Sequence, residues 1–108
     1  MNEEYLTDAE GILEAIKRYW NAVERRSFTK STREIDYKKF RDFEKRNLIA
    51  IRMTPQKGDF VVRFKSHGLP AFLLDTGEVV FKSLELANKC AELYGKYALS
   101  HVQVMQIA

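Results

Sequence analysis

The shortages of cysteine, glycine and histidine are the first informative feature of this sequence. A single cysteine, Cys90, excludes an internal disulfide and suits a reducing compartment. The five glycines are scattered, so none belongs to a glycine-rich loop that cradles phosphate groups. His67 and His101 lie far apart in the chain, and neither has a second ligand at a metal-binding spacing. We therefore expect neither a metal site nor a cofactor.

Long apolar runs are also missing. No stretch approaches the roughly 20 apolar residues that span a bilayer. The N-terminal stretch MNEEYLTDAE is acidic and lacks the apolar core of a signal peptide. A chain of 108 residues has room for one modest hydrophobic core. We expect one cytoplasmic domain over residues 1–108.

The hydrophobic periodicity predicts an α+β fold with the element order α-α-β-β-β-β-α-β. The sheet should be mostly antiparallel, with the helices mainly on one face. The predicted helices are at about 8–25, 37–46 and 84–96, and the predicted strands are at about 47–53, 59–65, 71–75, 78–82 and 101–107.

Local signals mark the predicted starts of the three helices. Thr7 and Glu10 have the spacing of a capping box. The polar stretch RRSFTKSTREID is interpreted as a loop, so that Asp36 would cap the second helix and Ser83 the third. The first helix should bury an apolar stripe made of Ala9, Ile12, Leu13, Ile16, Tyr19, Trp20 and Val23.

The stretch LLDTGE resembles the Asp-Thr-Gly signature of retroviral-type aspartic proteases, which pair two such aspartates around a water. That family follows its signature with a long flap and a later glycine-containing segment, and VQVMQIA has no such glycine. A hairpin turn at Asp75, Thr76 and Gly77 accounts for the same residues, with Gly77 supplying a positive φ. Cys90 falls in an apolar helical stripe, where cysteine behaves as a core residue. We expect a protein that is not an enzyme.

Charge is distributed unevenly along the chain. Residues 1–16 have a net charge of −5, residues 17–46 of +6, residues 47–65 of +3 and residues 66–108 of −1. A basic region of this kind attracts phosphate groups or an acidic protein surface.

The stretch DYKKFRDFEKRN combines aromatic and basic side chains. Tyr37, Phe40 and Phe43 are three residues apart, which indicates core anchors on one helical face and leaves the basic residues on the others. In the strands, alternation places Ile49, Ile51, Phe60, Val62 and Phe64 toward the helices and predicts a wet opposite face with aligned bases. The candidate nucleic-acid-binding residues are Arg25, Arg26, Lys30, Arg33, Lys38, Lys39, Arg41, Lys45, Arg46, Arg52, Arg63 and Lys65.

The stretch GEVVFKSLELANKCA is similar to the three-strand-plus-helix DNA-binding modules of mobile-element integrases. Phe81, Lys82, Ser83 and Ala87 match the pattern that opens the supporting helix of those modules. The resemblance implies DNA binding, although the first two helices and the final strand have no counterpart in such a module.

Three functions follow as alternatives. The first is binding of nucleic acid or a nucleoprotein complex through residues 25–65, without sequence specificity. The second is a protein-binding accessory factor, such as a phage-encoded, anti-CRISPR-like inhibitor of a host defence complex. It would use the basic surface or the acidic residues Glu3, Glu4, Asp8, Glu10 and Glu14. The third is a homodimer formed by pairing of the final strand.

Overall fold

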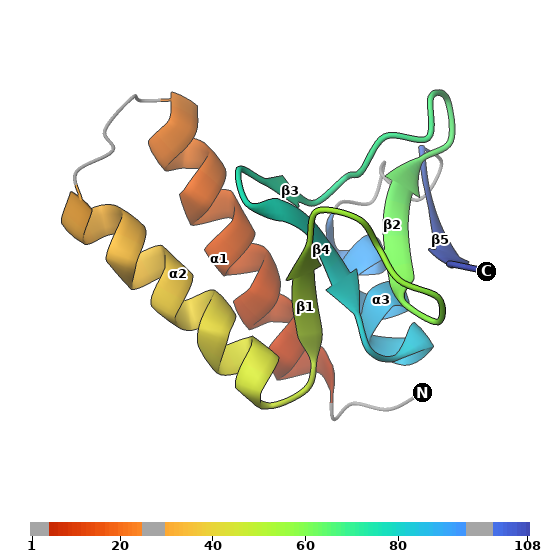
Figure 1. Cartoon of the computed structure of the whole chain (residues 1–108), viewed down its shortest axis with the longest axis horizontal. Coiled ribbons are helices and arrows are strands. Elements are labelled where there is room, and N and C mark those ends of the chain that lie inside the picture. The colour runs from red at the N-terminus through yellow and green to blue at the C-terminus, as the bar shows by residue number, and fades with distance from the viewer. Residues whose placement is uncertain (1–4, 25–29, 95–100) are drawn as a thin grey trace.

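The computed structural model describes residues 5–24, 30–94 and 101–108, with main chain alone at 22–24 and 30–36. The element order confirms the predicted α-α-β-β-β-β-α-β arrangement (Figure 1). The helices are α1 (Leu6–Glu24), α2 (Lys30–Lys45) and α3 (Leu84–Tyr94), and the strands are β1 (Ile49–Arg52), β2 (Phe60–Phe64), β3 (Leu73–Leu74), β4 (Gly77–Phe81) and β5 (Val102–Gln106).

The strands form an antiparallel sheet in the order β1-β4-β2-β5, with β3 also pairing with β4. Because β4 lies between β1 and β2, the segment 53–59 has to cross β4 to connect them (Figure 1). The register pairs β2 with β4 at Phe60 and Phe81. Farther along, segment 69–72 fills the space between these strands, where Ala71 N–H donates to Val62 O at 2.9 Å.

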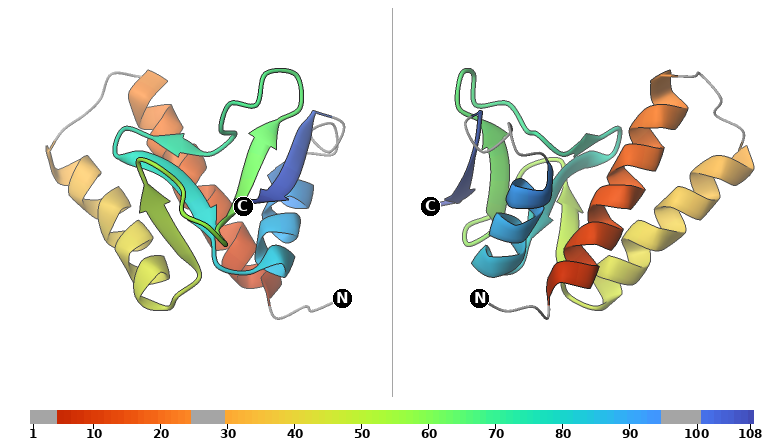
Figure 2. Two further views of the ribbon diagram at one scale, coloured as in Figure 1. Left: turned by 45° about the vertical axis from the view of Figure 1, so that its right-hand side comes forward. Right: turned by 180° about the vertical axis from the view of Figure 1, so that it is seen from behind.

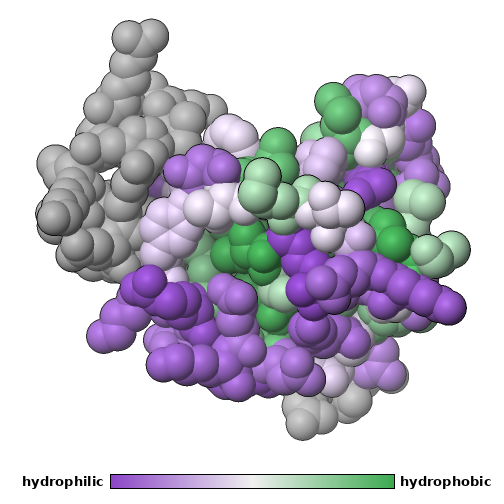
Figure 3. All heavy atoms as spheres, in the orientation of Figure 1, coloured by the Kyte–Doolittle hydropathy of each residue, from purple (hydrophilic) through white to green (hydrophobic). Residues whose placement is uncertain are grey.

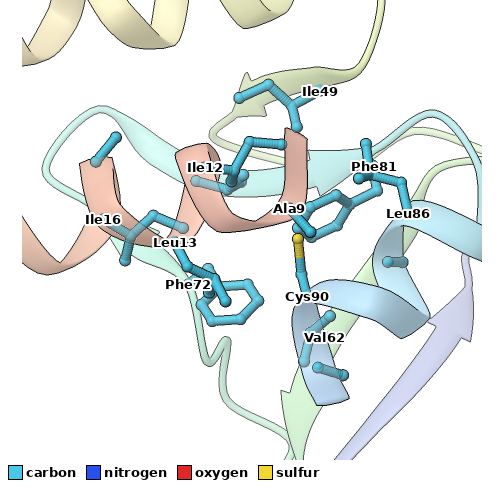
Figure 4. Close-up of a cluster of buried hydrophobic side chains, with 14 of the residues drawn as sticks. Ala9, Ile12, Leu13, Ile16, Ile49, Val62, Phe72, Phe81, Leu86 and Cys90 are labelled. Carbon is cyan, nitrogen blue, oxygen red and sulfur yellow. The ribbon is translucent and has the colours of Figure 1, made fainter. Parts of the chain in front are cut away.

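Helices α1 and α3 cover one face of the sheet, and α2 lies alongside α1 (Figures 1 and 2). Their apolar stripes meet the strands in one hydrophobic core. Figure 4 shows Ile12 and Leu13 of α1, Cys90 of α3 and Phe72 and Phe81 converging there. The predicted core side of β1 and β2 is confirmed, because Ile49 and Val62 are buried in this cluster and Ile51, Phe60 and Phe64 pack against it.

The main chain at the end of α2 is closed by a Schellman motif. Asn47 has a φ of 60°, its N–H donates to Glu44 O at 2.9 Å, and Leu48 N–H donates to Phe43 O at 3.1 Å. Phe43 and Leu48, the two positions that are commonly apolar in this motif, both pack against the core. The exit from α2 into β1 is therefore fixed.

Two predicted helix starts were wrong. Helix α1 begins at Leu6, so Thr7 lies inside its first turn, and α2 begins at Lys30, so Asp36 lies within the helix. The stretch 30–36 contains neither glycine nor proline and includes Lys, Arg and Glu, which are good helix formers. The stretch is therefore a polar part of helix α2 and not a loop. The Ser83 cap is confirmed, since its hydroxyl accepts a hydrogen bond from Leu86 N–H at 3.1 Å.

The hairpin between β3 and β4 is confirmed, although β3 is shorter than the predicted strand 71–75. Gly77 has a φ of +145°, and a Cβ at this position would lie 2.6 Å from the carbonyl carbon and oxygen of Arg52. Two tyrosines hold the turn: Asp75 N–H donates to the Tyr19 hydroxyl at 2.7 Å, and the Tyr37 hydroxyl donates to the Asp75 carboxylate.

The close approach at Gly77 predicts a large effect of a single methyl group. Gly68 is a suitable control, because its φ is also positive, at +72°, while nothing lies within 4 Å of a Cβ there. We expect Gly68→Ala to lower the free energy of unfolding by about 1–2 kcal/mol through backbone strain alone. Gly77→Ala should lower it by at least about 3 kcal/mol, since the Arg52 main chain must also move. Urea denaturation measures both, and equal losses would contradict the steric argument.

Candidate nucleic-acid interface

Three basic residues on the outward side of α2 form an exposed group that is available to a ligand. Lys38, Arg41 and Lys45 are spaced by three and four residues, which places them along one side of the helix. All three are exposed, whereas Phe40 on the opposite side is fully buried. Within the described part of the chain, none of the three forms an ion pair. We call Lys38, Arg41 and Lys45 the α2 stripe.

Lys39 and Arg46 lie on the side of α2 that faces α1. They line a groove of about 600 Å³ between the two helices, together with Glu14 and Asp42, and Lys45 of the α2 stripe lies at the border of the same groove. The Arg46 Nη2 atom is 2.8 Å from Asp8 Oδ1, so this ion pair joins the end of α2 to the start of α1. Arg46 therefore has a structural partner, and the groove has mixed charge.

Arg63 is held by a buried carboxylate on the neighbouring part of the sheet. Its Nη2 and Nε atoms donate to the two carboxylate oxygens of Glu78, at 2.9 and 3.2 Å. Glu78 is 4% exposed. The hydrogen bond to Glu78 raises the pKa of the Arg63 guanidinium, although partial burial opposes this shift. The charge of Arg63 is therefore neutralised inside the fold.

Arg52 is also paired internally. Its Nε atom is 2.8 Å from Asp59 Oδ2, in an ion pair without the geometry of a hydrogen bond. The same Asp59 oxygen accepts a hydrogen bond from Gln56 N–H at 2.8 Å. The pair thus links the end of β1 to the segment that crosses β4.

The prediction of a wet, basic sheet face was therefore wrong. Alternation placed Arg52 and Arg63 on the correct side, but the two carboxylates lie there as well, and Val61 and Val80 are buried on it. Figure 3 shows hydrophilic residues over α2 and in a second area across the sheet, with hydrophobic residues between them. The expected continuous positive surface is interrupted.

The remaining predicted nucleic-acid-binding residues are described by the structure to different extents. Arg25 and Arg26 lie outside the described residues, and Lys30 and Arg33 belong to α2 without described side chains. Lys65 is exposed and directly follows β2, a strand on the other side of the molecule from α2 (Figure 1). Of the described candidates, the structure brings together the α2 stripe.

Burial raises the pKa of two side chains that could otherwise act in catalysis, Tyr37 and Cys90. Burial, followed by the hydrogen bond to Asp75, raises the pKa of Tyr37 to about 12. Burial raises the pKa of the Cys90 thiol to about 12, so it stays protonated at neutral pH. Among the described residues, no three His, Cys, Asp or Glu side chains are grouped as metal ligands.

An apolar groove was not foreseen from the sequence. It has a volume of about 540 Å³ and lies between α1, the end of α3 and segment 64–73, with Trp20, Leu73 and Tyr94 among its lining residues. Trp20 was predicted to be buried with the α1 stripe, but its side chain is 39% exposed. Helical spacing placed Trp20 in the apolar stripe and contained no signal for neighbours that are distant in the chain.

No family model matches the sequence, and searches of curated proteins and of solved structures give no significant match either. In the described residues, no helix combines the length and the apolar character needed to cross a membrane.

The burial of Glu78 predicts that Arg63 contributes to stability. We expect Arg63→Met to lower the free energy of unfolding by about 2–4 kcal/mol, because it leaves a buried carboxylate without its partner. Replacing both residues, as Arg63→Met/Glu78→Leu, should restore part of this loss. The control is Lys89→Met, whose partner Glu92 is 3.7 Å away and exposed, and which should cost less than about 1 kcal/mol. Chemical denaturation compares the three variants, and an unaffected Arg63→Met would show that the pair is dispensable.

Proposed function

We propose that this protein binds the phosphate backbone of a nucleic acid, free or within a nucleoprotein complex, through the α2 stripe. The observation that carries the proposal is the alignment of three exposed basic side chains without internal partners among the described residues. Basic residues of this kind bind phosphates by releasing condensed counterions, without reading the sequence.

The length of the stripe suits a phosphate backbone. Lys38 and Lys45 are two helical turns apart, which is about 10 Å along the axis. About three phosphates of one strand rise by that distance along a duplex. The stripe can therefore contact several phosphates while α2 remains rigid.

The inward position of the aromatic residues limits the mode of binding. Phe40 is fully buried, Phe43 packs against the core, and Tyr37 donates to Asp75. None of the three is free to stack on a base, which is the usual source of affinity for single strands. We expect sequence-independent binding with a Kd of roughly 10⁻⁴–10⁻⁶ M at physiological salt.

A second candidate function is binding to a single protein, as in an anti-CRISPR-like inhibitor. The apolar groove favours it, because Trp20 and Tyr94 are 39% and 36% exposed. Tryptophan and tyrosine in apolar pockets are the residues that dominate binding energy at protein interfaces. This candidate requires neither free nucleic acid nor the α2 stripe.

Charge reversal of the stripe tests the first proposal. Lys38→Glu/Arg41→Glu/Lys45→Glu should abolish binding to generic single- and double-stranded DNA and RNA, measured by fluorescence anisotropy across a salt series. For wild type on duplex DNA, the three contacts should contribute about 2.7 to the slope of log K against log salt.

The matched control is Arg18→Glu/Lys57→Glu/Lys82→Glu. It makes the same change in net charge at three exposed positions on α1, in the segment that crosses β4 and after β4. The control should retain most of the binding. If both variants lost the same amount of affinity, the loss would reflect net charge and would not place the binding site on α2. Absence of binding by wild type at low salt would overturn the proposal and leave the protein-binding candidate, for which Trp20→Ala in a pull-down is the next variant.

A further inference from the structure

Strand β5 lies at the rim of the sheet, and one side of its main chain faces outward (Figure 2). Its register with β2 pairs Val104 with Val62, and Lys65 N–H donates to His101 O at 2.7 Å. At the other end, Ile107 N–H donates to Asp59 O at 2.9 Å. Odd-numbered residues therefore turn their main-chain groups toward β2. By alternation, Val102, Val104 and Gln106 turn theirs toward the open edge.

Among the residues that the structure describes, this edge lacks the usual protection against pairing. Edge strands avoid partners through lysine, proline, a bulge or a covering helix. The sequence of β5, VQVMQ, contains no charged residue and no proline. By contrast, β1 at the opposite edge has four residues and lies next to α2. The unprotected edge in the described sheet is that of β5.

We propose that a second copy of this chain pairs with β5 in the antiparallel direction, about a two-fold axis at Val104. Val104 then faces Val104 of the second copy, and Val102 faces Gln106 in both directions. Each of these residues carries outward main-chain groups, so donors meet acceptors along the whole strand. An isologous contact of this kind is self-complementary and closes as a dimer.

Apolar residues flank the edge on both faces of the sheet. Met105 is 41% exposed on the face away from the helices, and Leu84 at the start of α3 is 48% exposed. Leu93 lines a groove with residues of α1, so helical spacing places Leu84 and Asn88 on the side of α3 away from α1, and α3 also contacts β5. Joining two sheets brings the two α3 helices together through these uncharged positions. The charge-free strand and its apolar flanks favour a second copy over a charged partner strand.

Sedimentation velocity across a concentration series tests the dimer. Gln106→Pro removes an outward N–H while leaving the bonds to β2 intact, and Gln106→Ala is the control for the side chain, whose contact with Gly58 O is 3.4 Å. Because the two-fold axis doubles the loss, we expect the proline variant to raise the dimer Kd about thirty-fold. The alanine variant should leave it nearly unchanged. A wild type that is monomeric throughout, or a proline variant that dimerises normally, would overturn the proposal.

Cysteine cross-linking tests the register without relying on the proline variant. In the proposed pairing Gln103 faces Met105 of the second copy at a non-hydrogen-bonded position, where Cα atoms are about 4.5 Å apart and fit a disulfide. A mixture of Gln103→Cys and Met105→Cys should form the mixed disulfide on oxidation, and each variant alone should form little. The native Cys90 is fully buried and does not compete. Cross-linking that is equal in the mixture and in the separate variants would reject this register.

Discussion

The main chain at Arg52 passes Gly77 so closely that no side chain fits between them, and the arrangement of the sheet depends on that passage. Here the chain leaves β1 and crosses β4 on its way to β2. The crossing brings Asp59 to Arg52, while the register of β1 and β4 places Glu78 beside them, within reach of Arg63. The tyrosines that hold Asp75 keep the same hairpin in place from the helical side.

The faces of the elements were predictable from the sequence because a face is set by near neighbours. Alternation in β1 and β2 and the three-residue spacing of Tyr37, Phe40 and Phe43 identified the buried side of each element correctly. Strand order was beyond this reasoning. The pairing of Phe60 with Phe81 joins strands whose connection contains another strand, and no local pattern specifies it.

The candidate site shows the same contrast between features set by near neighbours and features set by distant segments. The α2 stripe was predictable, since helical spacing alone aligns Lys38 with Lys45. Arg52 and Arg63 were assigned to a free surface because their carboxylate partners lie on segments that only the tertiary structure brings near. An arginine in the middle of a strand indicates either a solvent-exposed face or a buried acid, and the sequence does not distinguish the two. The predicted burial of Trp20 was wrong for a related reason, since its place in the apolar stripe of α1 does not show that it borders an open groove with Tyr94 at the end of α3.

The strand order also determines when the sheet can assemble. During synthesis β1 and β2 emerge before either of their hydrogen-bonding neighbours, because β1 pairs with β4 and β2 with β4 and β5. The hydrogen-bonding edges of β1 and β2 therefore stay unpaired until the later strands, up to residue 106, have been made, and each of these pairings joins segments that are far apart in the chain. Such non-local pairing slows folding relative to a sheet of consecutive hairpins. The pairing of α1 with α2, which are adjacent in the chain, can form while β1 and β2 are still unpaired.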